Sequence, residues 1–101
     1  MRLTLQQQSV IRTTLNETFG EQANIWLFGS RVDDNKRGGD IDLLIETKES
    51  DVNAIVHAEL ALLTKLQMKL GEQKIDVLVD YPSRKYTPPI FTSAKQTGVQ
   101  L

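Results

Sequence analysis

Two aspartates separated by one residue, Asp40 and Asp42, are the side chains best placed for chemistry. Side chains alternate faces along a β-strand, so this spacing puts both carboxylates on one side of a strand. Two carboxylates that close repel each other unless a cation lies between them. Mg²⁺ prefers oxygen ligands and keeps room for phosphate oxygens. The pair therefore indicates a metal clamp for a polyphosphate, although a polar outer face of a strand would carry the same residues.

Glycines stand on both sides of the segment that leads to these acids. Gly29-Ser30 directly follows the apolar segment 24–28. A glycine there lacks the Cβ that would block a phosphate, and the free N–H groups of a turn bind anions. Ser30 adds a hydroxyl donor, and Gly38-Gly39 would also let a ligand approach the backbone closely. Taken alone, each of these dipeptides is equally compatible with an ordinary turn.

A third acid, Asp76, is flanked by Ile75 and Val77. An acid in an apolar strand costs free energy unless it is paired or bound to a metal. If its strand is the neighbour of the strand that carries Asp40 and Asp42, Asp76 lies beside them. It would then be a third metal ligand or the base that activates an incoming hydroxyl. The alternative is an ion pair with a nearby lysine or arginine.

The elements that position these residues follow from apolar periodicity and turn residues. The pattern predicts helices over 5–19, 49–70 and 89–97, and strands over 24–28, 40–46 and 74–80. Ser50 is the expected N-cap of the long helix. This order predicts an α/β (α+β) domain with a small mixed sheet of three to four strands flanked by helices. The long helical crossover favours parallel pairing of the last two strands.

Length and composition narrow the class of protein. The 101 residues fit a single domain spanning 1–101. The net charge of −1 counts against direct nucleic-acid binding, which usually shows a basic stripe. The absence of cysteine excludes disulfides and thiolate metal sites. No apolar run approaches the ~20 residues that span a bilayer, so we expect a cytoplasmic protein without a membrane segment.

The combined order of strand, Gly-Ser, loop, Asp-x-Asp strand, helix and Asp strand resembles the nucleotidyltransferase fold of the DNA polymerase β type. The stretch from Gly29 to Ile45 is similar to the Gly-Ser … Asp-x-Asp signature of that superfamily. Over nearly its whole length the chain closely resembles the minimal nucleotidyltransferase (MNT) family. It departs from that family at Asp33-Asp34, where Arg-Gly is common.

The resemblance assigns a role to each matching position. It implies that two Mg²⁺ ions are held by Asp40 and Asp42, with Asp76 completing the carboxylate triad. It also implies ATP as the nucleotide donor. The residues expected to contact the triphosphate are Gly29, Ser30, Arg31 and Gly39.

The resemblance also implies a biological role. Members of the MNT family often accompany a HEPN-domain protein, which is an RNase toxin. The expected function is that of an antitoxin that transfers AMP from ATP to this partner, typically to a tyrosine near its active site. One alternative is a non-catalytic binding module that blocks the toxin by complex formation. Another is nucleotidyl transfer to a small molecule or to tRNA.

Overall fold

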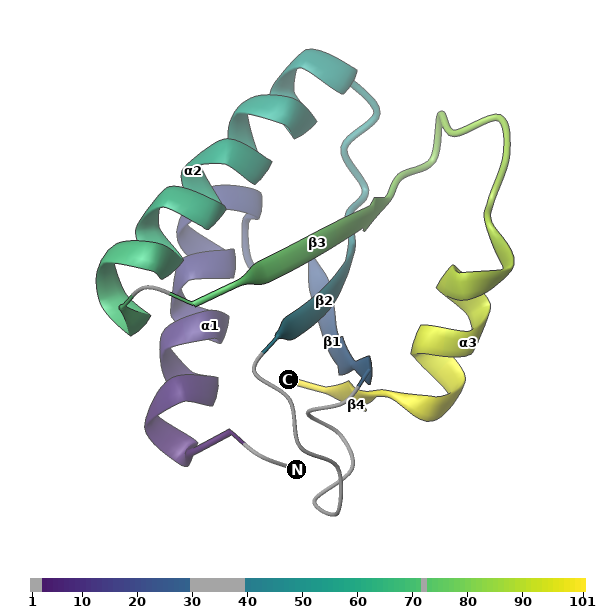
Figure 1. Cartoon of the computed structure of the whole chain (residues 1–101). Helices are drawn as coiled ribbons and strands as arrows, with labels where there is room; N and C mark the ends of the chain where they lie inside the picture. The colour runs from purple at the N-terminus through teal and green to yellow at the C-terminus, as the bar shows by residue number, and fades with distance from the viewer. Residues whose placement is uncertain (1–2, 30–39, 72) are drawn as a thin grey trace.

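The computed structural model describes residues 3–29, 40–71 and 73–101. The described segments form three helices and one four-stranded sheet (Figure 1). The elements in chain order are α1 (Leu5–Phe19), β1 (Asn24–Phe28), β2 (Ile41–Glu46), α2 (Val52–Leu70), β3 (Ile75–Asp80), α3 (Pro89–Thr97) and β4 (Val99–Gln100). The predicted helices and the three predicted strands are confirmed, with bounds that differ by three residues at most.

The sheet has the strand order β3-β2-β1-β4. β2 pairs with β1 in antiparallel fashion and with β3 in parallel fashion, and α2 makes the crossover between the two parallel strands. β4 adds a short antiparallel edge beside β1. The mixed α+β sheet predicted from the sequence is therefore confirmed, and the fourth strand is β4. Two residues are too few to show a strand period, so the sequence pattern did not single them out.

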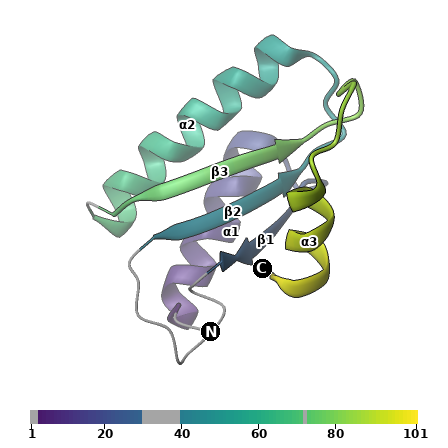
Figure 2. The same cartoon turned by 45° about the vertical axis from the view of Figure 1, so that its right-hand side comes forward.

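The sheet separates two layers of helices. α1 and α2 cover one face, and α3 covers the other (Figure 2). The alternation along β2 explains this arrangement, because Ile41, Leu43 and Ile45 point into the larger core while Leu44 points into the smaller one. The larger core also holds Ile11 and Leu15 of α1 and five further residues of α2 and β1, namely Ile55, Leu62, Leu66, Ile25 and Leu27. The apolar contact of α1 and α2 with the sheet is therefore the main packing of the domain.

The first two helices begin at side chains that cap their free N–H groups. The N-cap of α2 differs from the residue expected from the sequence. α1 begins at a capping box, in which the Thr4 hydroxyl accepts a hydrogen bond from the Gln7 N–H. α2 begins after Asp51 and not after Ser50, because the Asp51 carboxylate accepts from the Asn53 N–H at 3.0 Å. A carboxylate also interacts favourably with the positive end of the helix dipole. None of the helices in the described ranges is long and apolar enough to cross a membrane.

α3 is held to the sheet by a polar contact as well as by its small core. The Lys95 ammonium donates to Glu46 Oε2 at 2.6 Å and to Asp80 Oδ2 at 2.9 Å. It also lies 5.5 Å from the centroid of the Trp26 ring. Burial opposes the charge on Lys95, but the two hydrogen-bonded carboxylates outweigh it and raise the pKa of Lys95. This contact fixes α3 over the carboxyl ends of β2 and β3.

Gly98, which ends α3, provides a test of this packing. A Cβ at Gly98 would lie 2.6 Å from the Leu27 carbonyl oxygen and would also collide with the Ala94 carbonyl oxygen. We expect Gly98→Ala to lower the free energy of unfolding by about 1–3 kcal/mol, measured by urea denaturation. Gln96→Ala, at an exposed position of the same helix, should change it by less than about 0.5 kcal/mol. Equal unfolding midpoints for the two variants would contradict this account of the turn.

Candidate active site

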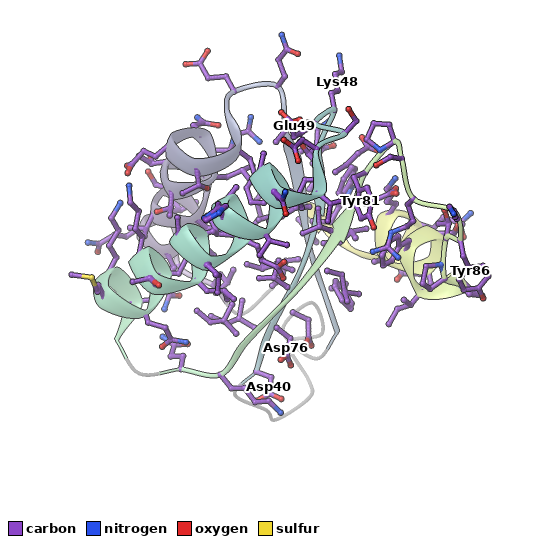
Figure 3. The ribbon with its side chains drawn as sticks, turned by 90° about the horizontal axis from the view of Figure 1, so that it is seen from above. Asp40, Lys48, Glu49, Asp76, Tyr81 and Tyr86 are labelled. Atoms are coloured by element: carbon purple, nitrogen blue, oxygen red, sulfur yellow. The ribbon has the colours of Figure 1, made fainter. Side chains whose placement is uncertain are left out.

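The parallel pairing of β2 and β3 brings two of the predicted acids together. Asp42 and Asp76 are register partners, and Phe28 of β1 is the partner of Asp42 on its other side. Register partners on neighbouring strands lie about 5 Å apart and present their side chains on the same face. Asp40 and Asp76 lie at the same end of the sheet in Figure 3. The expectation that Asp76 sits beside the Asp-x-Asp pair is thus met for Asp42.

Asp42 is the acid with the least favourable surroundings of the three. Burial raises the pKa of Asp42, and the charges of Asp76 and Asp40 raise it further. A hydrogen-bonding contact with Asp76 acts in the same direction, and the Lys74 ammonium opposes them. A cation bound between these carboxylates would relieve the repulsion.

Asp40 lies just before β2 and forms an ion pair with Lys74. Its Oδ2 atom lies 3.7 Å from Lys74 Nζ, and 48% of its side chain is exposed. Within residues 3–29, 40–71 and 73–101, no three acidic, histidine or cysteine side chains lie close enough together to hold a metal ion. The three-ligand assignment therefore stays a prediction. Lys74 was not singled out from the sequence, although it stands two residues before Asp76.

A second pair of acids on the same two strands gives a direct comparison. Glu46 and Asp80 are also register partners, four residues further along β2 and β3. Lys95 donates hydrogen bonds to both of these carboxylates. Among the described residues, no lysine or arginine forms an ion pair with Asp42 or Asp76. One pair thus has a lysine hydrogen-bonded to both carboxylates, whereas in the described part of the chain the charge of Lys74 acts on Asp42 without an ion pair to either member of the other pair.

Gly29 adjoins the Asp42 carboxylate, at the point where β1 ends. Its φ angle is +80°, which non-glycine residues rarely adopt. A Cβ at this position would also overlap Asp42 Oδ2. The sequence predicts a phosphate beside Gly29, whereas in the structure the Asp42 carboxylate lies where a Cβ of Gly29 would be. The other residues predicted to contact the triphosphate, Ser30, Arg31 and Gly39, lie outside the described residues.

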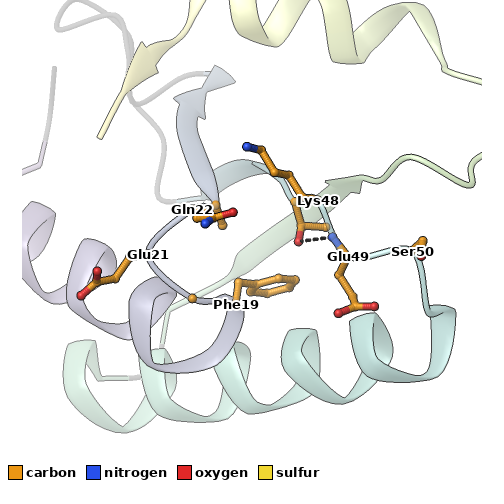
Figure 4. A pocket seen from close by; sticks show the side chains of 9 residues that line it. Phe19, Glu21, Gln22, Lys48, Glu49 and Ser50 are labelled. Carbon is orange, nitrogen blue, oxygen red and sulfur yellow. Dashed lines mark hydrogen bonds between the residues drawn. The ribbon is translucent and has the colours of Figure 1, made fainter.

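A pocket of about 370 Å³ lies at the opposite end of β2 from Asp42. Its lining comes from the end of α1 and the segment after β2, including Phe19, Lys48 and Glu49 (Figure 4). The Glu49 N–H donates to Thr47 Oγ1 at 3.1 Å and so orders that segment. None of the three candidate acids lines this pocket, so it is separate from the candidate site.

The four-stranded mixed sheet and the acids on its α3 face define the class of protein, a small α+β domain with the nucleotidyltransferase fold. The chain belongs to the nucleotidyltransferase domain family, whose model matches residues 9–96. No curated protein and no solved structure matches the chain. The family supports nucleotidyl transfer as the general activity, and with it the use of a nucleoside triphosphate and a divalent metal.

The raised pKa of Asp42 leads to a prediction about stability. An acid whose pKa is higher in the folded protein than in the unfolded chain destabilises the fold once it is ionised. Without metal at pH 7, Asp42→Asn should therefore raise the thermal midpoint, by a few degrees for about 1 kcal/mol. The gain should shrink as the pH falls through the Asp42 pKa, because the wild-type carboxyl then becomes neutral as well.

Asp80→Asn is the matched control, since it removes the same charge from the neighbouring acid pair. It deprives Lys95 of a hydrogen-bonded partner, so it should lower the midpoint. Differential scanning calorimetry across pH 3–7 would distinguish the two variants, taking about 4 as the ordinary pKa of aspartate. A midpoint lowered by Asp42→Asn as much as by Asp80→Asn would show that Asp42 is not electrostatically destabilised.

Proposed function

We propose that this chain transfers AMP from ATP to another molecule, with Mg²⁺ held by Asp42, Asp76 and Asp40. The observation that carries the proposal is the contrast between the two acid pairs of β2 and β3. Lys95 forms an ion pair with both Glu46 and Asp80, while Asp42 and Asp76 repel each other. Carboxylate oxygens are the ligands that Mg²⁺ prefers, so this donor set fits the metal that the family uses.

In this proposal each part of the chain has one task. Two bound Mg²⁺ ions supply the positive charge that stabilises the attacking and leaving oxygens of an in-line displacement. Asp42 holds the metal from the centre of the site, and Asp76, which is exposed on the outer strand, faces the incoming acceptor. The acceptor hydroxyl forms a bond to the α-phosphorus, the bond to the β-phosphate breaks, and pyrophosphate leaves. Asp76 accepts the hydroxyl proton if it acts as the base.

The triphosphate is expected to lie against the turn that follows β1. Gly29, Ser30, Arg31 and Gly39 are the contacts that the family resemblance implies, and the Asp42 carboxylate lies where a Cβ of Gly29 would be. The backbone N–H groups of such a turn favour an anion. This placement would bring the α-phosphorus next to Asp42.

The proposed acceptor is a protein, specifically a HEPN-domain RNase toxin that is inactivated by the added AMP. The resemblance to the MNT family motivates this partner. The size of the chain is compatible with it, because a domain of 101 residues has room for one sheet and few additional surfaces. The partner would then bring its own acceptor side chain to the carboxylates, and both proteins would meet in the cytoplasm.

A transfer assay tests the catalytic proposal. Incubation with α-labelled ATP, Mg²⁺ and a HEPN protein should label the partner. Asp42→Asn and Asp76→Asn should each reduce the rate by at least ~100-fold, since each removes a metal ligand. Asp51→Asn is the control of equal charge change, because asparagine also caps a helix well and Asp51 lies at the start of α2. Undiminished labelling by both site variants would refute the roles of Asp42 and Asp76 as metal ligands. Label on a small molecule or tRNA instead of the HEPN protein would show that the acceptor is not a protein.

A second candidate function is neutralisation of the toxin by binding alone. The contact of Asp40 with Lys74 favours it, because one of the three acids is engaged elsewhere. This alternative predicts that Asp42→Asn rescues cells from the toxin as well as wild type does, measured by colony counts at equal protein levels. Rescue lost in Asp42→Asn and retained in Asp51→Asn would favour catalysis.

A further inference from the structure

The side of α2 that faces away from the sheet exposes a set of apolar side chains. Their exposed fractions are 50% for Val52, 46% for Val56, 60% for Leu60 and 80% for Met68. Figures 1 and 2 show α2 lying along α1, with its far side uncovered. We call this side the outer face of α2 and define it by its exposed residues Val52, Asn53, Val56, His57, Leu60, Thr64, Gln67 and Met68.

The outer face of α2 carries no aspartate, glutamate, lysine or arginine, and every residue of this helix lies in the described ranges. The three charged residues of α2 lie elsewhere on its circumference. Lys65 and Lys69 both reach Glu17 of α1, and Glu59 is half-buried, with burial raising its pKa. A surface helix normally directs its charged residues to water. Absence of charge together with exposed apolar side chains is typical of the centre of a protein–protein interface.

The outer face has a second property, which concerns the order of its residues. Val52, Val56, Leu60, Thr64 and Met68 follow one another at intervals of four, so they form a continuous ridge on the helix. The positions at equal distances from Leu60 pair Val56 with Thr64, which has the same branched shape but carries a hydroxyl, and Val52 with Met68, which is also apolar. The order of shapes along the ridge is thus similar when it is read in either direction.

We propose that the outer face of α2 binds the same face of a second copy of this chain, with a two-fold axis passing at Leu60. A two-fold contact uses the same patch on both subunits, so each residue must suit its own symmetry partner. In an antiparallel pair centred on Leu60, Val56 meets Thr64 and Val52 meets Met68. The neutral face avoids the repulsion that like charges would cause across the axis.

Two amide side chains beside the ridge are also placed symmetrically about Leu60. Asn53 and Gln67 stand seven residues on either side of Leu60, and both end in a neutral amide. Gln67 already donates to the Gln73 carbonyl oxygen at 2.6 Å and accepts from the Gln73 N–H, so it contributes its aliphatic stem to the contact. The acids of the candidate active site share the face of the sheet that α3 covers, opposite to α2. The dimer therefore leaves both sites accessible.

Cysteine cross-linking tests the register directly, because the chain contains no cysteine of its own. With helix axes 8–10 Å apart and Cα atoms about 2.3 Å from each axis, the two Leu60 Cα atoms would be separated by about 3.4–5.4 Å. That range overlaps the separations of about 4.4–6.8 Å that disulfides span. Leu60→Cys should therefore form a disulfide-linked dimer of twice 11.4 kDa under mild oxidation.

Thr64→Cys is the matched control on the same ridge. Its two copies would be displaced by about 12 Å along the helix axis, which is too far for a disulfide. This variant should stay monomeric on a non-reducing gel. Equal cross-linking at positions 60 and 64 would indicate random collision and would overturn the proposed register.

Sedimentation equilibrium of the unmodified chain tests the dimer itself. The mass should rise from 11.4 kDa towards twice that value as the protein concentration increases. Leu60→Glu should abolish this rise, whereas Leu5→Glu, at an 83% exposed position of α1, should preserve it. Circular dichroism would confirm that both variants are folded. A constant monomer mass in the wild-type protein, together with no disulfide-linked dimer of Leu60→Cys, would overturn self-association. The outer face of α2 would then be a binding surface for a different protein.

Discussion

The parallel register between β2 and β3 is the constraint on which the rest of the structure depends. It places Asp42 against Asp76 at one end of the two strands and Glu46 against Asp80 at the other. Parallel strands require a long crossover, which α2 provides, and α2 in turn brings α1 into the main core. A register shift by one residue would reverse the faces of the side chains of one strand and separate both acid pairs. The fold and the candidate site therefore have the same geometric origin.

The ionised Asp42 carboxylate lowers the stability of the folded protein, and the packing of the surrounding core must offset this loss. Burial and neighbouring acids raise the pKa of Asp42, so its ionised form opposes folding. The absence of a side chain at Gly29 leaves space for this carboxylate. At the other end of the same strands, Lys95 forms an ion pair with each of two carboxylates. A built-in lysine suits a structural contact, whereas an acid pair with no ion-paired lysine among the described residues suits a ligand that comes and goes.

Sequence patterns predicted the elements and the neighbourhood of the acids because strong periodicity and turn residues mark them. The alternation over Ile41–Ile45 identified a strand with an apolar face and a face that carries the acids, and the helical crossover implied its parallel partner. Patterns of this kind contain no information on ion pairs between distant residues. Thus the contact of Lys74 with Asp40 and the bridging role of Lys95 appear only in three dimensions. The cap at Asp51 differs from the expected Ser50 because neighbouring polar residues compete for one helix end, and local geometry selects between them.

The position of Trp26 gives the protein a built-in optical signal. It is the single tryptophan of the chain, and it is half-buried in the small cluster between the sheet and α3. The Lys95 ammonium lies over its ring. Indole emission depends on the polarity and the charge around the ring, so any displacement of α3 would alter the fluorescence spectrum. Phe28 packs against the same small cluster and is the register partner of Asp42, so the fluorophore and the candidate site share one neighbour.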